Sequence, residues 1–264
     1  MALATISSDL RGNIFTIDHN GHVHRNKHTK GEREGPLVSP GLGEKVGSGW
    51  NGVRSLAVVR IKDATCLAGI DPDGNLVASV GTGKDPQFKT PTKVAIAPPN
   101  IRQVFGGTKC FFLVTVDGGL VQQPIAITKG VLQPGQGTEI EPTGWGDGLA
   151  LFTNGDGTFF DVTFGGTLRY QLATKSTGAP RSGQWIPIAT GWSRNHGVFG
   201  AGPGGIYRIA SEGALEHHRY ATTIDGIVQV SPRGRHTTVG SGLFPWTGLA
   251  ADIEGFAWPM SVTR

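Results

Sequence analysis

Long apolar runs are missing from this chain of 264 residues. No stretch approaches the roughly 20 consecutive apolar residues that a membrane-spanning helix needs, so we expect no insertion into a membrane. The first residues, MALATISSDLRGN, also lack a basic segment followed by an apolar core, so no secretory signal is visible. The sequence therefore predicts a soluble protein that is cytoplasmic or is released by a non-classical route.

Cysteine is scarce, with only Cys66 and Cys110 in the whole chain. Two cysteines are too few for a disulfide framework, and a chain of this length can build its own apolar core. The two residues occupy matching places in two sequence repeats, and equivalent positions on neighbouring units are usually too far apart to bridge. We expect two small buried side chains, and a disulfide between them is the alternative.

Clustered charge and helical periodicity are also missing. The 24 Lys and Arg residues and the 20 Asp and Glu residues give a net charge of +4, and the basic residues are scattered. Because nucleic-acid-binding proteins usually carry a clustered basic face, nucleic acid is not an expected partner. No useful stretch has apolar residues at helical spacing, whereas 42 Gly and 16 Pro indicate many tight turns.

One phrase of two β-rich runs around a glycine turn occurs five times. It reads NIFTIDHNGHV from Asn13, CLAGIDPDGNL from Cys66, CFFLVTVDGGL from Cys110, TFFDVTFGGTL from Thr158 and GIYRIASEGAL from Gly205. The turn glycines are Gly21, Gly74, Gly118, Gly166 and Gly213, which lie 53, 44, 48 and 47 residues apart. Repeats of this period, built only from strands and turns, are typical of propeller blades.

A second pattern, the Gly-Trp marker, runs in phase with the phrase. It reads SGWNG around Trp50, TGWGD around Trp145, TGWSR around Trp192 and, in a variant form, FPWTG around Trp246. The second repeat has Ile101 at this position. A strand-like run precedes each marker and another follows it, so each repeat supplies about four strands, the number in one blade.

These patterns predict an all-β fold, a single β-propeller domain over residues 1–264 with five blades of four antiparallel strands. The last residues, GFAWPMSVTR, begin another copy of the phrase. We therefore expect both termini to close the ring, with residues 256–262 in the same blade as the N-terminal strands or next to them. Six blades are the alternative, because the N-terminal run LATISS could start a blade of its own.

The order of marker, apolar strand, turn and aromatic strand leading into a glycine hairpin resembles the tachylectin-2 type of lectin. The resemblance covers essentially the whole chain and lies in pattern and spacing. It implies a five-bladed propeller that binds N-acetylglucosamine and N-acetylgalactosamine. The family's repeats also carry an Asp-Asn-Trp element before the fourth strand, and here only Gln184-Trp185, in RSGQWIPIAT, is similar to it.

A sugar-binding site needs a flat aromatic surface for the C–H groups of the sugar, with fixed donors and acceptors for its hydroxyls. The candidate carbohydrate-binding residues that meet this need are Trp50, Asn51, Trp145, Asp147, Trp185, Trp192, Arg194, Asn195 and Trp246. The alternative is that the marker tryptophans are packing anchors between blades. We assign a purely structural role, bonding to the turn backbone, to the polar residues Asn20, Asp73 and Asp117.

Metal and catalytic sites are not expected. His22 and His24 point to the same face of a strand, but no spaced cysteine or carboxylate set completes a metal site in the sequence. There is no G-x-S-x-G nucleophile motif, and the inner-strand candidates SLAVVRI, QVFGG, LALFT and GVFGA carry no carboxylate. The sequence therefore predicts a multivalent lectin that binds glycans or glycoproteins without a cofactor. A propeller scaffold for protein–protein interaction is the alternative.

Overall fold

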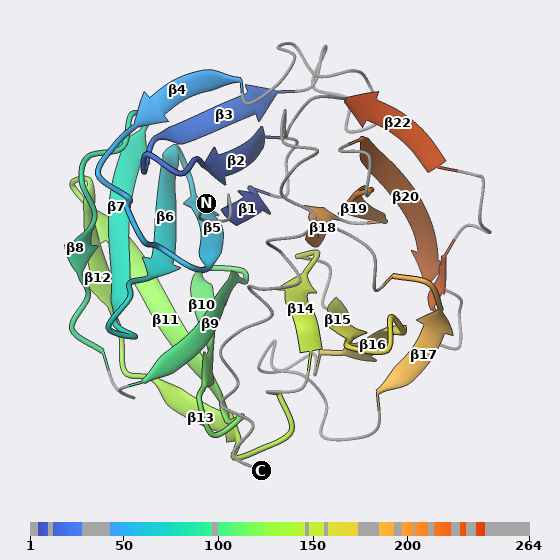
Figure 1. Cartoon of the computed structure of the whole chain (residues 1–264). Helices are drawn as coiled ribbons and strands as arrows, with labels where there is room; N and C mark the ends of the chain where they lie inside the picture. Colours follow the sequence, from blue (N-terminus) through green and yellow to red (C-terminus); the bar gives the residue numbers. More distant parts are fainter. Residues whose placement is uncertain are drawn as a thin grey trace.

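A computed structural model describes residues 5–9, 13–27, 43–96, 100–145, 148–155, 158–173, 185–192, 197–202, 204–210, 214–222, 228–230 and 236–240. These residues form five antiparallel sheets arranged around a common centre (Figure 1). The described part of the chain contains β-strands and turns but no helix. The predicted all-β fold of five propeller blades is confirmed.

The strands follow one another blade by blade along the chain. The first blade contains β1 (Thr5–Ser8), β2 (Asn13–Ile17), β3 (Val23–Lys27) and β4 (Glu44–Gly47). The second contains β5 (Leu56–Ile61), β6 (Ala64–Ile70), β7 (Leu76–Thr82) and β8 (Thr92–Lys93). The third contains β9 (Ile101–Gly106), β10 (Cys110–Thr115), β11 (Leu120–Thr128), β12 (Val131–Pro134) and β13 (Thr138–Glu141). The fourth contains β14 (Gly148–Thr153), β15 (Thr158–Thr163), β16 (Leu168–Leu172) and β17 (Ile186–Ala189). The fifth contains β18 (Gly197–Gly202), β19 (Gly205–Ile209), β20 (Leu215–Thr222), β21 (Val228–Val230) and β22 (His236–Gly240).

Every blade has the same four-strand order, with its first strand innermost and its fourth outermost. The third and fifth blades each have one additional strand because β11 and β20 are long. The first part of β11 pairs with β13 in the fourth position, while its end forms a hairpin with β12. In the same way β20 pairs with both β22 and β21.

The inner strands form a closed ring in which each contacts its two neighbours, in the order β1, β5, β9, β14, β18 and back to β1. Side-chain hydroxyls join neighbouring blades at this ring. Ser8 donates through Oγ to the carbonyl of Gly200, and Thr153 donates through Oγ1 to the carbonyl of Gly106 at 2.7 Å. The described part of the run LATISS, Thr5–Ser8, is the inner strand of the first blade, so the six-blade alternative is wrong. Residues 256–262, which we expected to help close the ring, lie outside the described residues.

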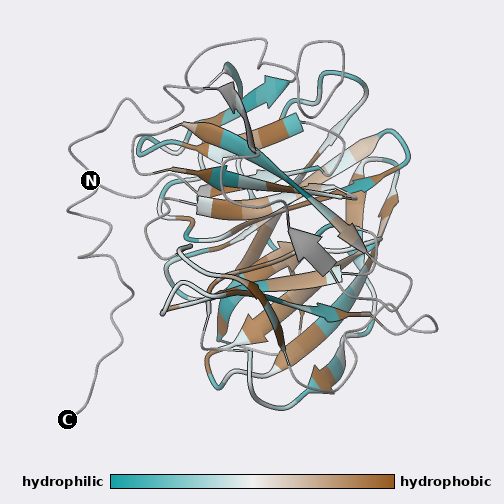
Figure 2. Cartoon of the chain, turned by 90° about the vertical axis from the view of Figure 1, so that its right-hand side faces the viewer, coloured by the Kyte–Doolittle hydropathy of each residue, from teal (hydrophilic) through white to brown (hydrophobic). Residues whose placement is uncertain are grey.

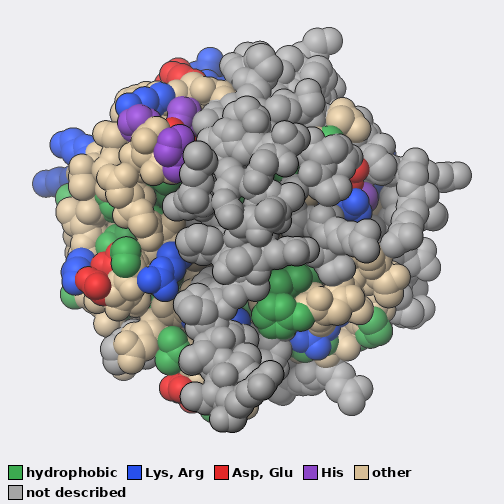
Figure 3. Space-filling view, viewed as in Figure 1, with side chains coloured by type: hydrophobic (Ala, Val, Ile, Leu, Met, Phe, Trp, Pro, Cys, Tyr) green, Lys and Arg blue, Asp and Glu red, His purple; other side chains and the backbone are tan. Residues whose placement is uncertain are grey.

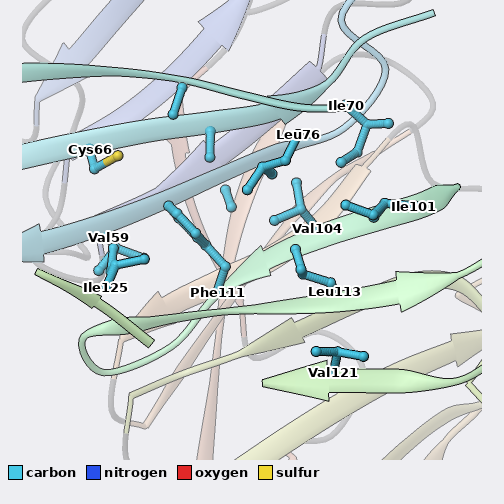
Figure 4. Close-up of a cluster of buried hydrophobic side chains, with 13 residues drawn as sticks. Val59, Cys66, Ile70, Leu76, Ile101, Val104, Phe111, Leu113, Val121 and Ile125 are labelled. Carbon is cyan, nitrogen blue, oxygen red and sulfur yellow. The ribbon is translucent and has the colours of Figure 1, made fainter. Parts of the chain in front are cut away.

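The hydrophobic core is divided into five clusters, one at each boundary between neighbouring blades. Figure 4 shows the cluster between the second and third blades, where Cys66 and Leu76 lie across from Ile101, Phe111 and Leu113. The cluster between the fifth and first blades joins Ile14 to Phe199, Tyr207, Ile209 and Leu215. This last cluster closes the ring by apolar contact. Figure 2 shows that apolar residues lie mainly along the strands.

Both cysteines are free and buried, and they lie at different blade boundaries. The expectation of small buried side chains is confirmed. Burial raises the pKa of the Cys66 thiol to about 12. Burial also raises the pKa of Cys110 to about 11, although the amide of Gln122 donates to its sulfur. Both thiols are therefore protonated at neutral pH.

We predict that neither cysteine reacts with a thiol reagent while the protein is folded. The raised pKa values alone lower the thiolate fraction at pH 8 by roughly 100-fold or more relative to an exposed cysteine. Absorbance with Ellman's reagent should show almost no reaction in buffer and two reactive thiols in guanidinium chloride. Fast labelling of either cysteine in the folded protein would contradict its placement in the core.

Candidate functional site

A backbone hydrogen bond links the marker position to the hairpin glycine in four blades. The marker follows the fourth strand of a blade, and the hairpin joins the second and third strands of that blade. The peptide N–H of the marker residue donates to the glycine carbonyl in Trp50–Gly21 (3.0 Å), Ile101–Gly74 (3.2 Å), Trp145–Gly118 (2.9 Å) and Trp192–Gly166 (3.0 Å). The bond needs only main-chain atoms. Ile101 can therefore form it in the second repeat, where the other repeats have tryptophan.

The hairpins themselves are held by a side-chain cap at the residue that enters the turn. Asp18 accepts through Oδ1 from the N–H groups of Asn20 (2.9 Å) and His22 (2.8 Å). The same position is held by Asp71, Thr115 and Thr163, whose side-chain oxygens also accept backbone N–H groups. The sequence analysis gave this role to Asn20, Asp73 and Asp117. The caps lie two residues earlier, because an oxygen at the start of the turn reaches the N–H groups two and four residues on.

The capping carboxylates are held in their ionised form. Burial would raise the pKa of Asp18, but hydrogen bonds from the His22 and Asn20 backbone and from the His24 and His22 side chains outweigh it and lower the pKa. Burial would also raise the pKa of Asp71, but hydrogen bonds, chiefly from the side chain and backbone of Asn75, outweigh it and lower the pKa. Each cap therefore contributes stability above the ordinary pKa of aspartate and loses it as the pH falls through the lowered folded-state pKa.

The marker tryptophans are buried between blades. The exposed fractions of Trp50, Trp145 and Trp192 are 0%, 5% and 4%, and each ring belongs to a different boundary cluster. This burial favours packing, the alternative weighed for these residues, over stacking on a sugar. Asn51 is exposed, and it lies against the first hairpin, close to Gly21.

The other candidate residues fall into two groups. Asp147, Arg194, Asn195 and Trp246 lie outside the described residues. Trp185 is described and only partly buried, and it lies against Trp145 with ring centroids 5.0 Å apart and planes at 63°. The structure therefore brings two predicted residues together, Trp145 and Trp185, at the boundary between the third and fourth blades.

Arg169 and Asp161 complete what we call the Trp185 cluster, which consists of Trp145, Asp161, Arg169 and Trp185. The guanidinium carbon of Arg169, on β16, lies 5.1 Å from the ring centroid of Trp185, which is a cation–π contact. Arg169 donates through Nε to Asp161 Oδ2 at 2.5 Å. The Asp161 side chain is 1% exposed, whereas Arg169 is 26% exposed. A buried carboxylate thus fixes a partly exposed cation against a partly exposed indole.

The boundary between the fourth and fifth blades repeats this arrangement with a buried ring. Arg208 lies over Trp192, with its guanidinium carbon 5.6 Å from the ring centroid. It forms an ion pair with Glu216 at 3.2 Å, and His218 Nε2 lies 3.0 Å from the same carboxylate oxygen of Glu216. Because Trp192 is buried, this second group offers no comparable aromatic surface to a ligand.

Sequence reasoning missed the two arginines and their acidic partners, although a signal was present. Asp161 and Arg169 are direct cross-strand neighbours, and so are Arg208 and Glu216. In an antiparallel hairpin, residues at equal distances from the turn face each other, so opposite charges at such positions predict an ion pair. Searching each phrase around its turn for this charge symmetry would have found both pairs.

Acidic side chains are missing from the described inner strands, since none of the five carries Asp or Glu. Asp9, which directly follows β1, accepts from Asn13 Nδ2 at 2.6 Å, with Arg60 at 3.5 Å. The described residues contain one group that could hold a metal ion, Asp18, His22 and His24, whose carboxylate the sequence analysis missed. Figure 3 shows histidine side chains together over the first blade.

No helix long and apolar enough to cross a membrane occurs among the described residues.

No protein-family model and no curated protein matches the chain. Many solved structures are similar to it, including the following three. An α-L-arabinofuranosidase from Clostridium thermocellum has a TM-score of 0.53 and 10% identity, covering 89% of this chain and 95% of its own. The SapL1 lectin in complex with alpha methyl fucoside has a TM-score of 0.50 and 8% identity, covering 90% and 96%. A mutant of AofleA from Arthrobotrys oligospora has a TM-score of 0.50 and 12% identity, covering 91% and 74%. At these identities the likeness shows the propeller fold alone.

We predict that Trp192→Ala lowers the free energy of unfolding by about 3–5 kcal/mol, because it removes a large buried ring from the boundary between two blades. Equilibrium unfolding in guanidinium chloride measures the loss. The matched control is Ile186→Ala, which truncates a side chain that is 46% exposed and should change stability by no more than about 0.5 kcal/mol. If Trp192→Ala were as stable as the wild type, the packing interpretation would be contradicted and sugar stacking would be favoured for Trp192.

Proposed function

We propose that this chain is a carbohydrate-binding propeller, a lectin that binds glycans or glycoproteins and does not catalyse a reaction. N-acetylated hexosamines are the proposed sugars, on the basis of the resemblance to tachylectin-2-type lectins. The proposal is supported by the five-bladed ring of this chain, which is the fold that the resemblance implies, and by the likeness in fold to SapL1, a lectin whose structure was solved in complex with alpha methyl fucoside. Because that likeness extends to the fold alone, the choice between hexosamine and fucose rests on the experiment below.

The observation that carries the proposal is the partly exposed indole of Trp185 beside a fixed cation. Of the four tryptophans that the structure describes, Trp185 alone is not buried. It lies outside the repeated marker, and while one part of its side chain packs against the cluster between the third and fourth blades, another part remains exposed. An aromatic surface next to a charged donor matches the amphipathic character of a sugar, which has apolar C–H patches and a ring of hydroxyls.

Arg169 supplies the polar half of this surface. Its Nε is bound by the buried carboxylate of Asp161, so the planar guanidinium is held in one orientation over Trp185. The remaining N–H groups of a guanidinium can donate to a sugar hydroxyl or to the carbonyl of an acetamido group. We therefore assign sugar stacking to Trp185, hydrogen bonding to Arg169 and positioning of Arg169 to Asp161.

The number of sites is expected to be smaller than the number of blades. Trp185 has no counterpart in the corresponding stretches PQFKTPT, GQGTEIE and GRHTTVG, and Ile101 replaces the marker tryptophan in the second repeat. Any further site therefore uses other residues than the Trp185 cluster, and a rigid ring with more than one site gains avidity for a clustered glycan because the second binding event is intramolecular. We propose multivalent binding through a few unequal sites.

We predict that titration with a monovalent sugar gives fewer than five sites, and that Trp185→Ala removes one of them. Isothermal titration calorimetry with N-acetylglucosamine, N-acetylgalactosamine and alpha methyl fucoside measures stoichiometry and identifies the sugar. The control Ile186→Ala removes an exposed apolar side chain from the adjacent position and should leave the stoichiometry unchanged. Five equal sites, or unaltered binding by Trp185→Ala, would contradict the assignment of the Trp185 cluster.

A protein-binding scaffold is the competing function, and one observation favours it. Val116 and Phe164 are 56% and 45% exposed, and they occupy matching positions at the hairpin tips of the third and fourth blades. Exposed apolar side chains on neighbouring blades suit a protein partner. A glycan array separates the two functions, since a scaffold would bind no glycan on the array, N-acetylated hexosamines included.

A further inference from the structure

We infer that Asp18, His22 and His24 form a binding site for one divalent transition-metal ion, for which Zn²⁺ is the representative. The inference is independent of the sugar-binding proposal and concerns the hairpin of the first blade. Asp18 Oδ2 lies 3.2 Å from His22 Nδ1 and 3.1 Å from His24 Nε2. The three ligand atoms all lie within 4.8 Å of one another.

The backbone of the hairpin brings these three side chains together. Asp18 directly follows β2, while His22 precedes β3 and His24 lies within it. Val23 between the two histidines is buried, and alternation along a strand places His22 and His24 on the same side. Because Oδ1 of Asp18 is occupied by two backbone N–H groups, its Oδ2 is fixed toward the imidazole rings.

The ligand set and its spacing suit a transition metal. Two imidazole nitrogens and one carboxylate oxygen are typical ligands of zinc and of other first-row metals that accept nitrogen ligands. In a tetrahedral site with bonds of about 2.0–2.2 Å, neighbouring ligand atoms lie roughly 3.3–3.5 Å apart. The two N···O distances of 3.1 and 3.2 Å need only a small expansion to reach this spacing. The His22 side chain is 33% exposed, which leaves solvent access for a fourth ligand.

The second blade shows that the turn does not need the histidines. Asp71 caps the equivalent turn, its Oδ2 accepts from Asn75 Nδ2 at 2.9 Å, and Val77 stands where the first blade has His24. An amide and an apolar side chain are therefore sufficient for folding at these positions. The first blade instead has histidine at these two positions, His22 and His24. The same capped turn therefore brings two imidazole nitrogens close to the carboxylate of Asp18.

The surroundings indicate a moderate affinity. The second ring nitrogen of His24, Nδ1, is buried and has no hydrogen-bond partner among the described residues. Lys45, opposite His24 on the neighbouring strand, adds an exposed positive charge. Metal-bound histidines usually donate their other N–H to an acceptor, and loss of such a partner typically weakens metal binding 10–100-fold. We therefore expect a dissociation constant in the micromolar range.

The test is calorimetric titration of metal-free, untagged protein with Zn²⁺ alone. The wild type should bind one ion, and His22→Asn and His24→Val should each weaken binding at least about 10-fold, because each removes a ligand. These changes introduce the residues that the second blade carries at the same positions, so the fold should be retained. The matched control is His19→Ala, which removes a neighbouring histidine outside the ligand set and should leave the affinity unchanged.

Two further measurements keep the inference falsifiable. Co²⁺ should give visible absorption bands with the wild type, and the bands should be lost in His22→Asn. Should either histidine variant fail to fold by circular dichroism, Asp18→Asn replaces it, since an amide oxygen can still cap the turn; this variant should also weaken binding at least 10-fold. Absence of Zn²⁺ binding by the wild type, or wild-type affinity in a folded ligand variant, overturns the inference.

Discussion

The hydrogen bond from the marker residue to the hairpin glycine is the contact on which the arrangement of the blades depends. Its acceptor is the hairpin glycine of one blade, and its donor lies where the chain passes to the next blade; Ile101, the donor to Gly74, is the first residue of β9 in the third blade. The glycine carbonyl is available because the turn glycines, such as Gly21 with φ of 71° and Gly74 with φ of 81°, adopt a left-handed conformation that other residues rarely accept. Once the end of the fourth strand is held beneath the hairpin, the marker side chain enters the gap between two blades.

The blades stabilise one another because each contributes apolar side chains to two boundaries. Ile14 and Phe15 are neighbours on β2, yet Ile14 belongs to the cluster with the fifth blade and Phe15 to the cluster with the second. Phe159 and Phe160 are divided in the same way between the third and fifth blades. A sheet with both faces apolar needs a neighbour on each side, and closure of the ring provides one for every blade.

This packing also decides which residues remain for chemistry. The repeated aromatic residues are used at the boundaries, so the groups that can meet a ligand are those that depart from the repeat. Trp185 with Arg169 is one such departure, and His22 with His24 is another. In both places a carboxylate holds a residue that does not follow the repeat: Asp161 orients Arg169, and Asp18 orients His22. A regular ring thus supplies rigidity, and individual blades carry the sites that we propose.

The sequence by itself determined the blade count and the strand order, because a repeat of fixed period and the alternation along each strand are local properties of the chain. It also placed Cys66 and Cys110 in the core. It could not decide whether Trp50 and Trp192 face solvent or the next blade, since a tryptophan in a turn fits either environment. That choice was made by the marker hydrogen bond and by the neighbouring blade.

The meeting of Trp145 with Trp185 was likewise decided by tertiary structure, because 40 positions and the three strands β14, β15 and β16 separate them along the chain. The approach of Asp18 to two histidines depends on the turn that Asp18 itself caps. Strands and turns follow from spacing in the sequence, but contacts between side chains at a blade boundary follow from the closure of the ring. The physical reason is that such contacts join residues whose separation in space is set by the curvature of the whole ring and not by their separation along the chain.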